Sequence, residues 1–265
     1  MRPTADTTLI PGAEPYSHRG SEVGVLLCHG FTGSPHSMRP WAEHLAAAGY
    51  SVEVPLLPGH GTQWRDMNLT TSDDWYEAVE LALMELASRC DEVFVMGLSM
   101  GGALALRAAQ EYPDLVRGVV VVNPSLALED PRLPLIAPVR KLVARILPST
   151  PGLSSDVAKA GVVEGGYSRV PTAAAATLPK LWRAVRAGLP ALRAPVLAYR
   201  SLEDHVVGPR SLRLLVRGAV ATRVVVHPLH RSYHVATLDH DADVILDGSL
   251  AFVREWRRSG EGAVR

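Results

Sequence analysis

VFVMGLSMGG, residues 93–102, runs from four apolar residues into a glycine-flanked serine, and a helical pattern follows it. Its centre, GLSMG, matches the pattern G-x-S-x-G with Ser99 in the middle. A sharp strand-to-helix turn of this kind exposes the serine hydroxyl and aims the amide groups of the helix N-terminus at it, where they favour developing negative charge. The stretch therefore predicts a serine nucleophile, with a tight structural turn as the alternative.

The strand before Ser99 is one of several buried strands that alternate with helices along the chain. Strands appear as continuous apolar runs and helices as segments with one apolar face. Strands are predicted at 23–28, 51–56, 92–96, 115–122, 195–200 and 222–227, and helices at 37–48 with Ser37 as the cap, 73–89, 100–111 and 243–257. This alternation predicts an α/β fold in which helices cover both faces of a mostly parallel sheet.

Residues 125–190 break the alternation, because they hold many prolines and no convincing strand. We predict a core made of 1–124 and 191–265, with 125–190 inserted as a cap. Within the cap, LIAPVRKLVARIL (135–147) places apolar and basic residues on opposite helical faces. This segment is expected to roof a pocket; the alternatives are a helix packed on the edge of the core and transient contact with a lipid surface.

The composition is that of an ordinary globular protein. The chain has 265 residues, of which 47% are hydrophobic and 20% charged, and its 27 basic residues balance its 27 acidic ones. A zero net charge gives no reason to expect a nucleic-acid partner. The N-terminus has no apolar signal region, and no window of about 18 apolar residues occurs. We therefore expect a cytoplasmic protein.

Cofactor chemistry is not expected from the motifs. No His, Cys, Asp or Glu cluster has metal-ligand spacing, and no dinucleotide or phosphate-loop pattern occurs. The cysteines, Cys28 and Cys90, lie in or beside apolar runs and are expected to be buried free thiols. We predict no metal and no cofactor.

A serine hydroxyl needs a base, and the base needs an orienting acid, in the chain order serine, acid, histidine. The loop after the strand at 195–200 offers Glu203 and Asp204. We favour Asp204, because the chain turns away directly after it, and keep Glu203 as the fallback. The stretch before the last helix offers four histidines, of which His234, in a short loop, fits the base best; the others are His227, His230 and His240.

The expected chemistry is attack of Ser99 on an ester carbonyl, with His234 taking the proton and Asp204 stabilising the imidazolium. Two backbone N–H groups are expected to bind the oxyanion: that of Met100, directly after the nucleophile, and that of Phe31, in the loop HGFTG (29–33). His29 is expected to brace that loop, and His60 to be part of a second tight turn.

Five motifs together resemble the bacterial monoacylglycerol lipases and the small bacterial carboxylesterases of the α/β-hydrolase fold. They are VLLCHGFTGSPHSMRP (25–40), LPGHGT (57–62), GLSMGG (97–102), EDHVV (203–207) and SYHVATLD (232–239). The resemblance spans nearly the whole chain. It implies an α/β-hydrolase fold with a small cap, a triad of Ser99, Asp204 and His234, and oxyanion donors at Phe31 and Met100.

The resemblance also implies a substrate-binding carboxylate in the cap. The stretch EGGYSRVPTA (164–173) matches the family's pattern and puts this role on Glu164, which would accept hydrogen bonds from the glycerol hydroxyls of a monoacylglycerol. The alternative for Glu164 is a solvated surface charge. For the whole chain, the alternatives are a general short-chain carboxylesterase, an acyltransferase with the same triad, and a non-catalytic binding module.

Overall fold

The computed structural model describes residues 8–127, 146–152 and 155–257. Its main sheet has seven strands in the order β1-β3-β2-β4-β5-β8-β9, and every neighbouring pair is parallel except β1 with β3. These strands are β1 (Tyr16–His18), β2 (Val23–Cys28), β3 (Ser51–Val54), β4 (Glu92–Leu98), β5 (Val116–Val122), β8 (Val196–Ser201) and β9 (Val224–Leu229). The predicted mostly parallel α/β fold is confirmed.

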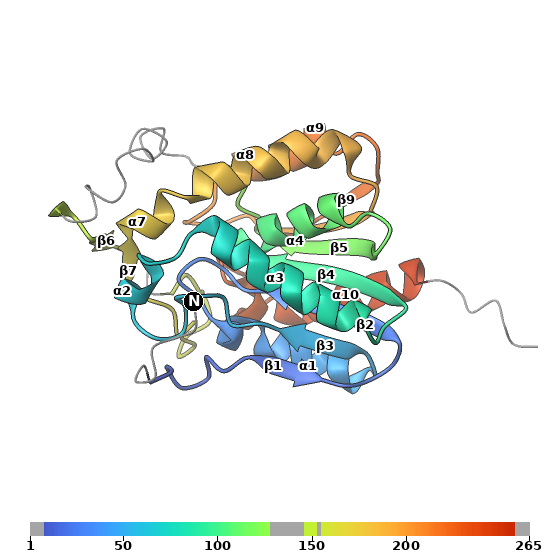
Figure 1. Ribbon diagram of the computed structural model, residues 1–265, viewed down its shortest axis with the longest axis horizontal. Helices are drawn as coiled ribbons and strands as arrows, with labels where there is room; N and C mark the ends of the chain where they lie inside the picture. The colour runs from blue at the N-terminus through green and yellow to red at the C-terminus, as the bar shows by residue number, and fades with distance from the viewer. Residues whose placement is uncertain (1–7, 128–145, 153–154, 258–265) are drawn as a thin grey trace, which may run out of the picture.

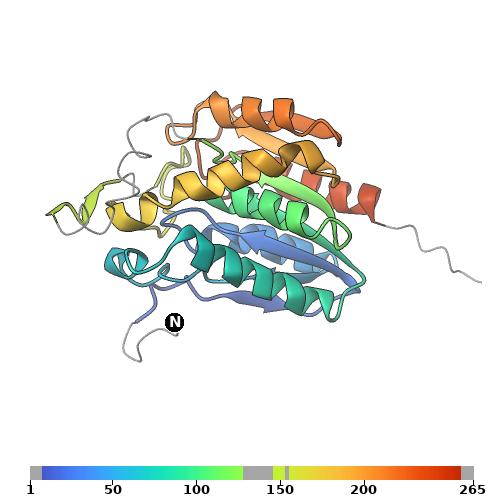
Figure 2. The ribbon, with the colours of Figure 1, turned by 45° about the horizontal axis from the view of Figure 1, so that its top comes forward.

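Helices cover both faces of this sheet (Figures 1 and 2). One face carries α3 (Ser72–Ala87), α4 (Met100–Glu111), α8 (Leu178–Gly188) and α9 (Pro209–Gly218), and the other carries α1 (Arg39–Ala47) and α10 (Ala242–Trp256). Short helices are η1 (Pro35–Met38), α2 (Trp64–Met67), α7 (Thr172–Ala175), η3 (Leu189–Ala191) and η4 (Ala236–Leu238). The central strands are therefore buried on both faces, which is why they read as continuous apolar runs.

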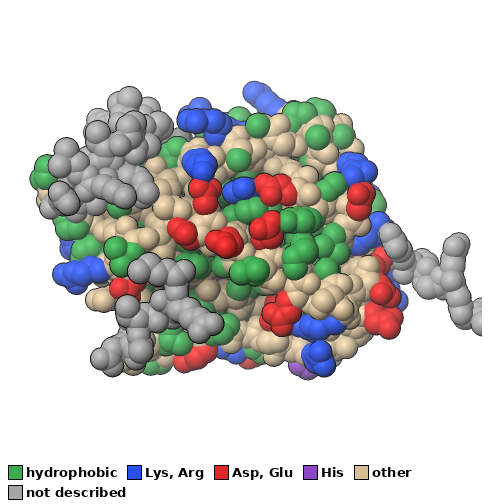
Figure 3. Space-filling view, viewed as in Figure 1, with side chains coloured by type: hydrophobic (Ala, Val, Ile, Leu, Met, Phe, Trp, Pro, Cys, Tyr) green, Lys and Arg blue, Asp and Glu red, His purple; other side chains and the backbone are tan. Residues whose placement is uncertain are grey.

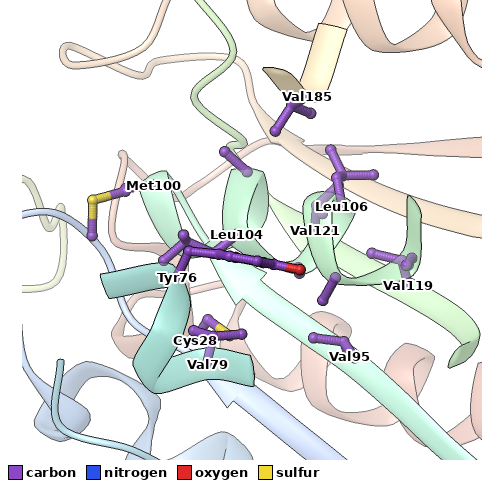
Figure 4. Close-up of a cluster of buried hydrophobic side chains, with 14 of the residues drawn as sticks. Cys28, Tyr76, Val79, Val95, Met100, Leu104, Leu106, Val119, Val121 and Val185 are labelled. Carbon is purple, nitrogen blue, oxygen red and sulfur yellow. The ribbon is translucent and has the colours of Figure 1, made fainter. Parts of the chain in front are cut away.

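Two apolar clusters fill the spaces between the sheet and its helices. Figure 4 shows part of the larger one, to which α3 contributes Tyr76 and Val79, α4 contributes Leu104, and β5 contributes Val119 and Val121. Burying a side chain such as Leu104 stabilises the fold by about 1.5–3 kcal/mol. This cluster holds α4 rigidly against β4 and β5, so that the turn between β4 and α4 has a fixed position.

The local predictions differ from the structure in a few places. The cap at Ser37 is wrong: Ser34 accepts from the His36 backbone N–H and begins η1, and α1 follows only at Arg39. Pro35 at the first position of η1 favours this earlier start. The three-residue strand β1 was not predicted, because a polar segment this short has no apolar periodicity.

The interval 125–190 contains more regular structure than its proline content suggested. A hairpin of β6 (Ser149–Pro151) and β7 (Arg169–Pro171) lies with α2 and α7 at one end of the molecule, on the left in Figure 1. α8, in contrast, packs Leu181 and Val185 into the larger core cluster. The amphipathic segment at 135–147 lies almost entirely outside the described residues, and the division at 125–190 stays a prediction.

The surface over α3 carries acidic and basic side chains interspersed with apolar ones (Figure 3), as the balanced composition predicts. Within the described ranges, no helix combines the length and the apolar character needed to cross a lipid bilayer. Cys28 and Cys90 are both buried free thiols.

Candidate active site

Ser99 occupies the turn between β4 and α4 in a strained backbone conformation. Its φ is 56° and its ψ is −116°, a region that residues with a side chain rarely adopt. The Ser99 N–H donates to the carbonyl of Val122 at 2.9 Å, and the Ser99 carbonyl accepts from Ser125 N at 3.0 Å. The end of β5 thus holds the turn in place.

The two glycines of the turn are required by close backbone approach. A Cβ built at Gly97 would lie 2.2 Å from the carbonyl oxygen of Gly101, and one built at Gly101 would lie 2.0 Å from the carbonyl oxygen of Cys28. Both distances are far below van der Waals contact, so a larger residue at either position would push the strand and helix apart. The sequence pattern therefore has a direct steric cause here.

His234 and Asp204 form a hydrogen-bonded pair. Nδ1 of His234 lies 3.0 Å from each carboxylate oxygen of Asp204. Both side chains are almost fully removed from solvent. A carboxylate at Nδ1 fixes the tautomer that leaves Nε2 free to accept a proton.

The loop that carries Asp204 keeps this carboxylate ionised. Burial alone would raise the pKa of Asp204, but the hydrogen bond and charge of His234, together with the backbone N–H groups of Val207 and Val206, hold the pKa below its usual value. Both N–H groups donate to Oδ1, at 2.8 and 2.9 Å. On the other oxygen, Arg200 donates to Oδ2 at 2.6 Å. Glu203, the fallback acid, is exposed.

Asn123 links the end of β8 to the loop that carries His234. It directly follows β5 with a positive φ of 45°. Its side-chain amide donates to the carbonyl of His234 at 2.8 Å, and its side-chain oxygen accepts from the backbone N–H of Ser201, at the end of β8, at 2.8 Å. The three candidate triad residues therefore follow the carboxyl ends of β4, β8 and β9.

The hydroxyl of Ser99 makes no hydrogen bond to His234 within the described part of the chain. Contacts between a nucleophile and its base often tighten only when substrate binds. The structure thus joins two of the three predicted residues directly and brings the third to the same sheet edge.

The loop HGFTG lies directly against Ser99. A Cβ built at Gly30 would be 3.5 Å from Cβ of Ser99. The N–H of the next residue, Phe31, donates no hydrogen bond within the described ranges, and the N–H of Met100 is at the first position of α4, where no intrahelical acceptor exists. Two backbone donors are therefore available beside Ser99.

Two buried histidines support this loop. His29 accepts from Leu57 N at 3.2 Å through Nε2, and its ring packs edge-on against His60 with centroids 4.9 Å apart. Phe31 and Trp75 complete the aromatic cluster. Burial lowers the pKa of His29 to about 4, and burial together with the charge of His29 lowers the pKa of His60 well below its usual value, so both rings are neutral. The bracing role predicted for His29 agrees with this packing.

Glu164 lies between the histidine and the HGFTG loop. Its Oε1 would be 3.0 Å from a Cβ built at Gly33. Burial raises the pKa of Glu164 to about 7, the charge of His234 opposes this rise, and the charge of Asp156 adds to it. Glu164 is therefore not a fully solvated surface charge, and a partly exposed carboxyl group with a pKa of about 7 lies against the HGFTG loop.

No group of three His, Cys, Asp or Glu side chains in residues 8–127, 146–152 and 155–257 is arranged to hold a metal ion. The chemistry available at this edge of the sheet comes from the serine, the imidazole, the carboxylates and the backbone N–H groups.

Comparison with known proteins agrees with this arrangement. Residues 24–160 match the family model of the alpha/beta hydrolase fold. A thermostable monoacylglycerol lipase of Bacillus sp. (strain H-257) is 41% identical over 244 residues, which cover 92% of this chain and 95% of that protein. The chain belongs to the α/β-hydrolase family. A carboxylesterase of Bacillus subtilis (strain 168) is 23% identical and covers 91% of the chain and 96% of its own length.

Among solved structures, a metagenome-derived lipolytic enzyme superposes on this α/β hydrolase with a TM-score of 0.88 and 41% sequence identity. The match covers 94% of this chain and 100% of the other. The resemblance inferred from the five sequence motifs is therefore confirmed at the level of the family.

Three residues near the site were not predicted from the sequence: Asn123, Arg200 and Asp156. Asn123 follows directly after a predicted central strand, so its position at the carboxyl end of that strand was an available signal. Arg200 sits at the end of the predicted strand that leads to the acid, and its basic side chain is unusual in a buried strand. Asp156 lies within the proline-rich interval, where no pattern in the sequence marked it.

Proposed function

We propose that this α/β hydrolase is a serine esterase with Ser99 as nucleophile, His234 as general base and Asp204 as the acid that orients the histidine. The observation that carries the proposal is the hydrogen bond between His234 and Asp204, buried at the sheet edge where Ser99 occupies its strained turn. A tight structural turn alone would not need a buried imidazole–carboxylate pair beside it.

In the proposed reaction, the Ser99 oxygen attacks the ester carbonyl carbon while its proton passes to Nε2 of His234. The tetrahedral intermediate collapses to an acyl-enzyme, and the same proton goes to the leaving alcohol. Water then attacks the acyl-enzyme and gives its proton to His234, which returns it to Ser99 as the carboxylic acid leaves. Asp204 stays ionised throughout and stabilises the imidazolium.

The proposed oxyanion donors are the backbone N–H groups of Phe31 and Met100. Two observations support them: among the described residues, neither N–H group donates a hydrogen bond, and the HGFTG loop lies against Ser99. Each such donor typically contributes about 10²–10³ in rate.

The proposed substrate is a monoacylglycerol, with Glu164 accepting hydrogen bonds from the two free glycerol hydroxyls. Two observations support this choice: the desolvated Glu164 carboxyl group against the HGFTG loop, and the 41% identity to a thermostable monoacylglycerol lipase. A buried acceptor disfavours an ester that lacks the hydroxyls, because the carboxylate would then be left without partners.

The test compares the hydrolysis of mono-, di- and triacylglycerol by the wild type and by Glu164→Gln. We expect the variant to lose activity selectively on monoacylglycerol and to cleave simple nitrophenyl esters as well as the wild type does. An equal loss on both classes would favour a general carboxylesterase, and transfer of the acyl group to an added alcohol in preference to water would favour an acyltransferase.

The remaining proposals concern the division of the chain and its location. We keep residues 125–190 as the cap inserted between the two parts of the hydrolase core, with β6, β7 and α7 beyond the strand ends that carry the site and α8 packed on the core. Two buried free cysteines are compatible with the proposed cytoplasmic location.

A further inference from the structure

Asp156 is a buried carboxylate in the cap that contacts the backbone of both catalytic loops. Its Oδ2 accepts from the backbone N–H of His234 at 3.1 Å and from the backbone N–H of His205 at 3.2 Å. Its Oδ1 lies 2.8 Å from Nδ1 of His205. Asp156 is only 8% exposed. One side chain thus joins the amide of the candidate base to the amide directly after Asp204.

The main chain of Asp156 adds a further contact to the same loop. Its carbonyl accepts from Val235 N at 3.0 Å, so residues 234 and 235 both donate to Asp156. The ring of His205 also packs edge-on against Tyr233, with centroids 4.7 Å apart. Asp156 thus accepts three hydrogen bonds from backbone N–H groups, two through its carboxylate and one through its carbonyl, and these restrain both loops.

A second carboxylate makes the reciprocal connection. Oδ2 of Asp239, in the histidine loop, accepts from Ala158 N at 2.7 Å and from Tyr233 N at 2.9 Å, and its Oδ1 accepts from Lys159 N at 2.9 Å. Asp156 in the cap therefore accepts from an amide of the histidine loop, and Asp239 in that loop accepts from amides of the cap. These reciprocal hydrogen bonds fix residues 156–159 against residues 233–235.

The same cap segment is also anchored beyond Glu164. Tyr167 N donates to the carbonyl of Thr32 at 3.0 Å, and the Tyr167 hydroxyl donates to the carbonyl of Gly59 at 2.9 Å. The segment is thus held to the histidine loop at one end and to the oxyanion loop at the other. Glu164 lies between these two anchors.

We propose that Asp156 is a positioning residue for the esterase reaction, and that its carboxylate sets the relative placement of His234 and Asp204 by holding the amides of His234 and His205. This proposal rests on the proposed function of the site. In this role, a residue of the cap helps to hold the loops of His234 and Asp204 in place. A misplacement of about 1 Å at reacting groups costs about 10²-fold in rate, which is the scale of the effect expected here.

The test uses Asp156→Asn, with Asp241→Asn as the matched control. Asp241 is 6% exposed and accepts from the backbone N–H of Arg231 at 2.8 Å in the same loop, but it does not touch His234 or His205. We expect Asp156→Asn to lower kcat by about 10- to 100-fold with KM nearly unchanged, equally on a nitrophenyl ester and on monoacylglycerol. Asp241→Asn should leave kcat close to that of the wild type.

A spectroscopic readout separates positioning from stability. The NMR resonance of the proton between His234 Nδ1 and Asp204 should shift in Asp156→Asn and stay in place in Asp241→Asn. If Asp156→Asn does not fold, because its amide group faces N–H donors, Asp156→Ser replaces it, since a hydroxyl can accept from one of them. Asp156→Glu, which restores the charge, should recover part of kcat.

Two results overturn the proposal: a folded Asp156 variant with wild-type kcat and an unshifted resonance, or an equal loss of kcat in Asp241→Asn. The proposed function fails separately, if Ser99→Ala keeps the esterase activity. A Ser99→Ala variant without activity, together with an unimpaired Asp156→Asn, would reject the positioning role and leave the proposed function standing.

Discussion

Nδ1 of His234 lies 3.0 Å from both carboxylate oxygens of Asp204, and the two side chains come from loops thirty residues apart in sequence. This bifurcated contact fixes the plane and the tautomer of the imidazole. Because neither side chain is appreciably exposed, water does not compete for the contact.

Asp204→Asn should therefore reduce kcat by about 10³- to 10⁴-fold, since an amide can hold the imidazole in the wrong tautomer and cannot stabilise the imidazolium. Steady-state hydrolysis of a nitrophenyl ester measures this loss. The control is Glu203→Gln, at the exposed neighbouring carboxylate, which should keep the activity of the wild type. A large loss in Glu203→Gln with a small one in Asp204→Asn would transfer the role of the acid to Glu203.

Arg200 should matter more for stability than for the reaction. Its guanidinium donates to Asp204 Oδ2 at 2.6 Å, and its side chain is 11% exposed. Arg200→Met breaks a buried ion pair from one side and should lower the free energy of unfolding by about 3 kcal/mol, as measured by urea unfolding at pH 7. Asp204 would still keep its bonds from His234, Val206 and Val207, so kcat should fall far less than in Asp204→Asn. An Arg200→Met variant as inactive as Asp204→Asn would contradict this separation of roles.

The pKa of about 7 at Glu164 predicts a pH-dependent selectivity. Below pH 7 the group is a neutral acid, and above pH 7 it is a carboxylate that accepts hydrogen bonds from both glycerol hydroxyls. The ratio of kcat/KM for monoacylglycerol to that for a nitrophenyl ester should rise about fivefold between pH 6 and 8, since charge assistance adds roughly 1 kcal/mol. Taking the ratio removes the titration of the shared catalytic groups. In Glu164→Gln the ratio should be flat with pH; a ratio that still rises would assign the titration to another group.

The same carboxyl group should also affect stability. Folding raises the pKa of Glu164 from 4.5 to about 7. The free energy of unfolding is therefore unaffected by this group below pH 4.5 and falls as the pH rises through 7, because ionisation of the folded protein is then disfavoured. The full shift corresponds to about 3 kcal/mol. Glu164→Gln should therefore be more stable than the wild type at pH 8.5 and about equally stable at pH 5, measured by urea unfolding at both values. Equal stability at pH 8.5 would mean that burial does not raise this pKa.

The architecture could be predicted from the sequence because its signals are local. The buried strands β2, β4 and β5 are continuous apolar runs, and the turn around Ser99 is marked by glycines that the close approach of strand and helix requires. The helix α4 was predicted at its observed bounds, because it begins directly after the serine and ends just before Pro113.

What escaped prediction depends on contacts between distant segments. Asp156 and His234 are 78 residues apart, and nothing near Asp156 in sequence shows that its carboxylate receives two loop amides. α8 was hidden in the proline-rich interval, although Leu181 and Val185 share an apolar face that packs into the core. The start of the helix after HGFTG was misplaced, since Ser34 and Ser37 are both good caps and only the backbone decides between them.

Covalent labelling measures directly whether Ser99 is the nucleophile. The intact protein is treated with a fluorophosphonate, and the adduct is located by peptide mass spectrometry. We expect a single adduct on Ser99, absent in Ser99→Ala and formed far more slowly in His234→Gln. A folded wild type that remains unlabelled, or an adduct on any other residue, would show that Ser99 is not the nucleophile.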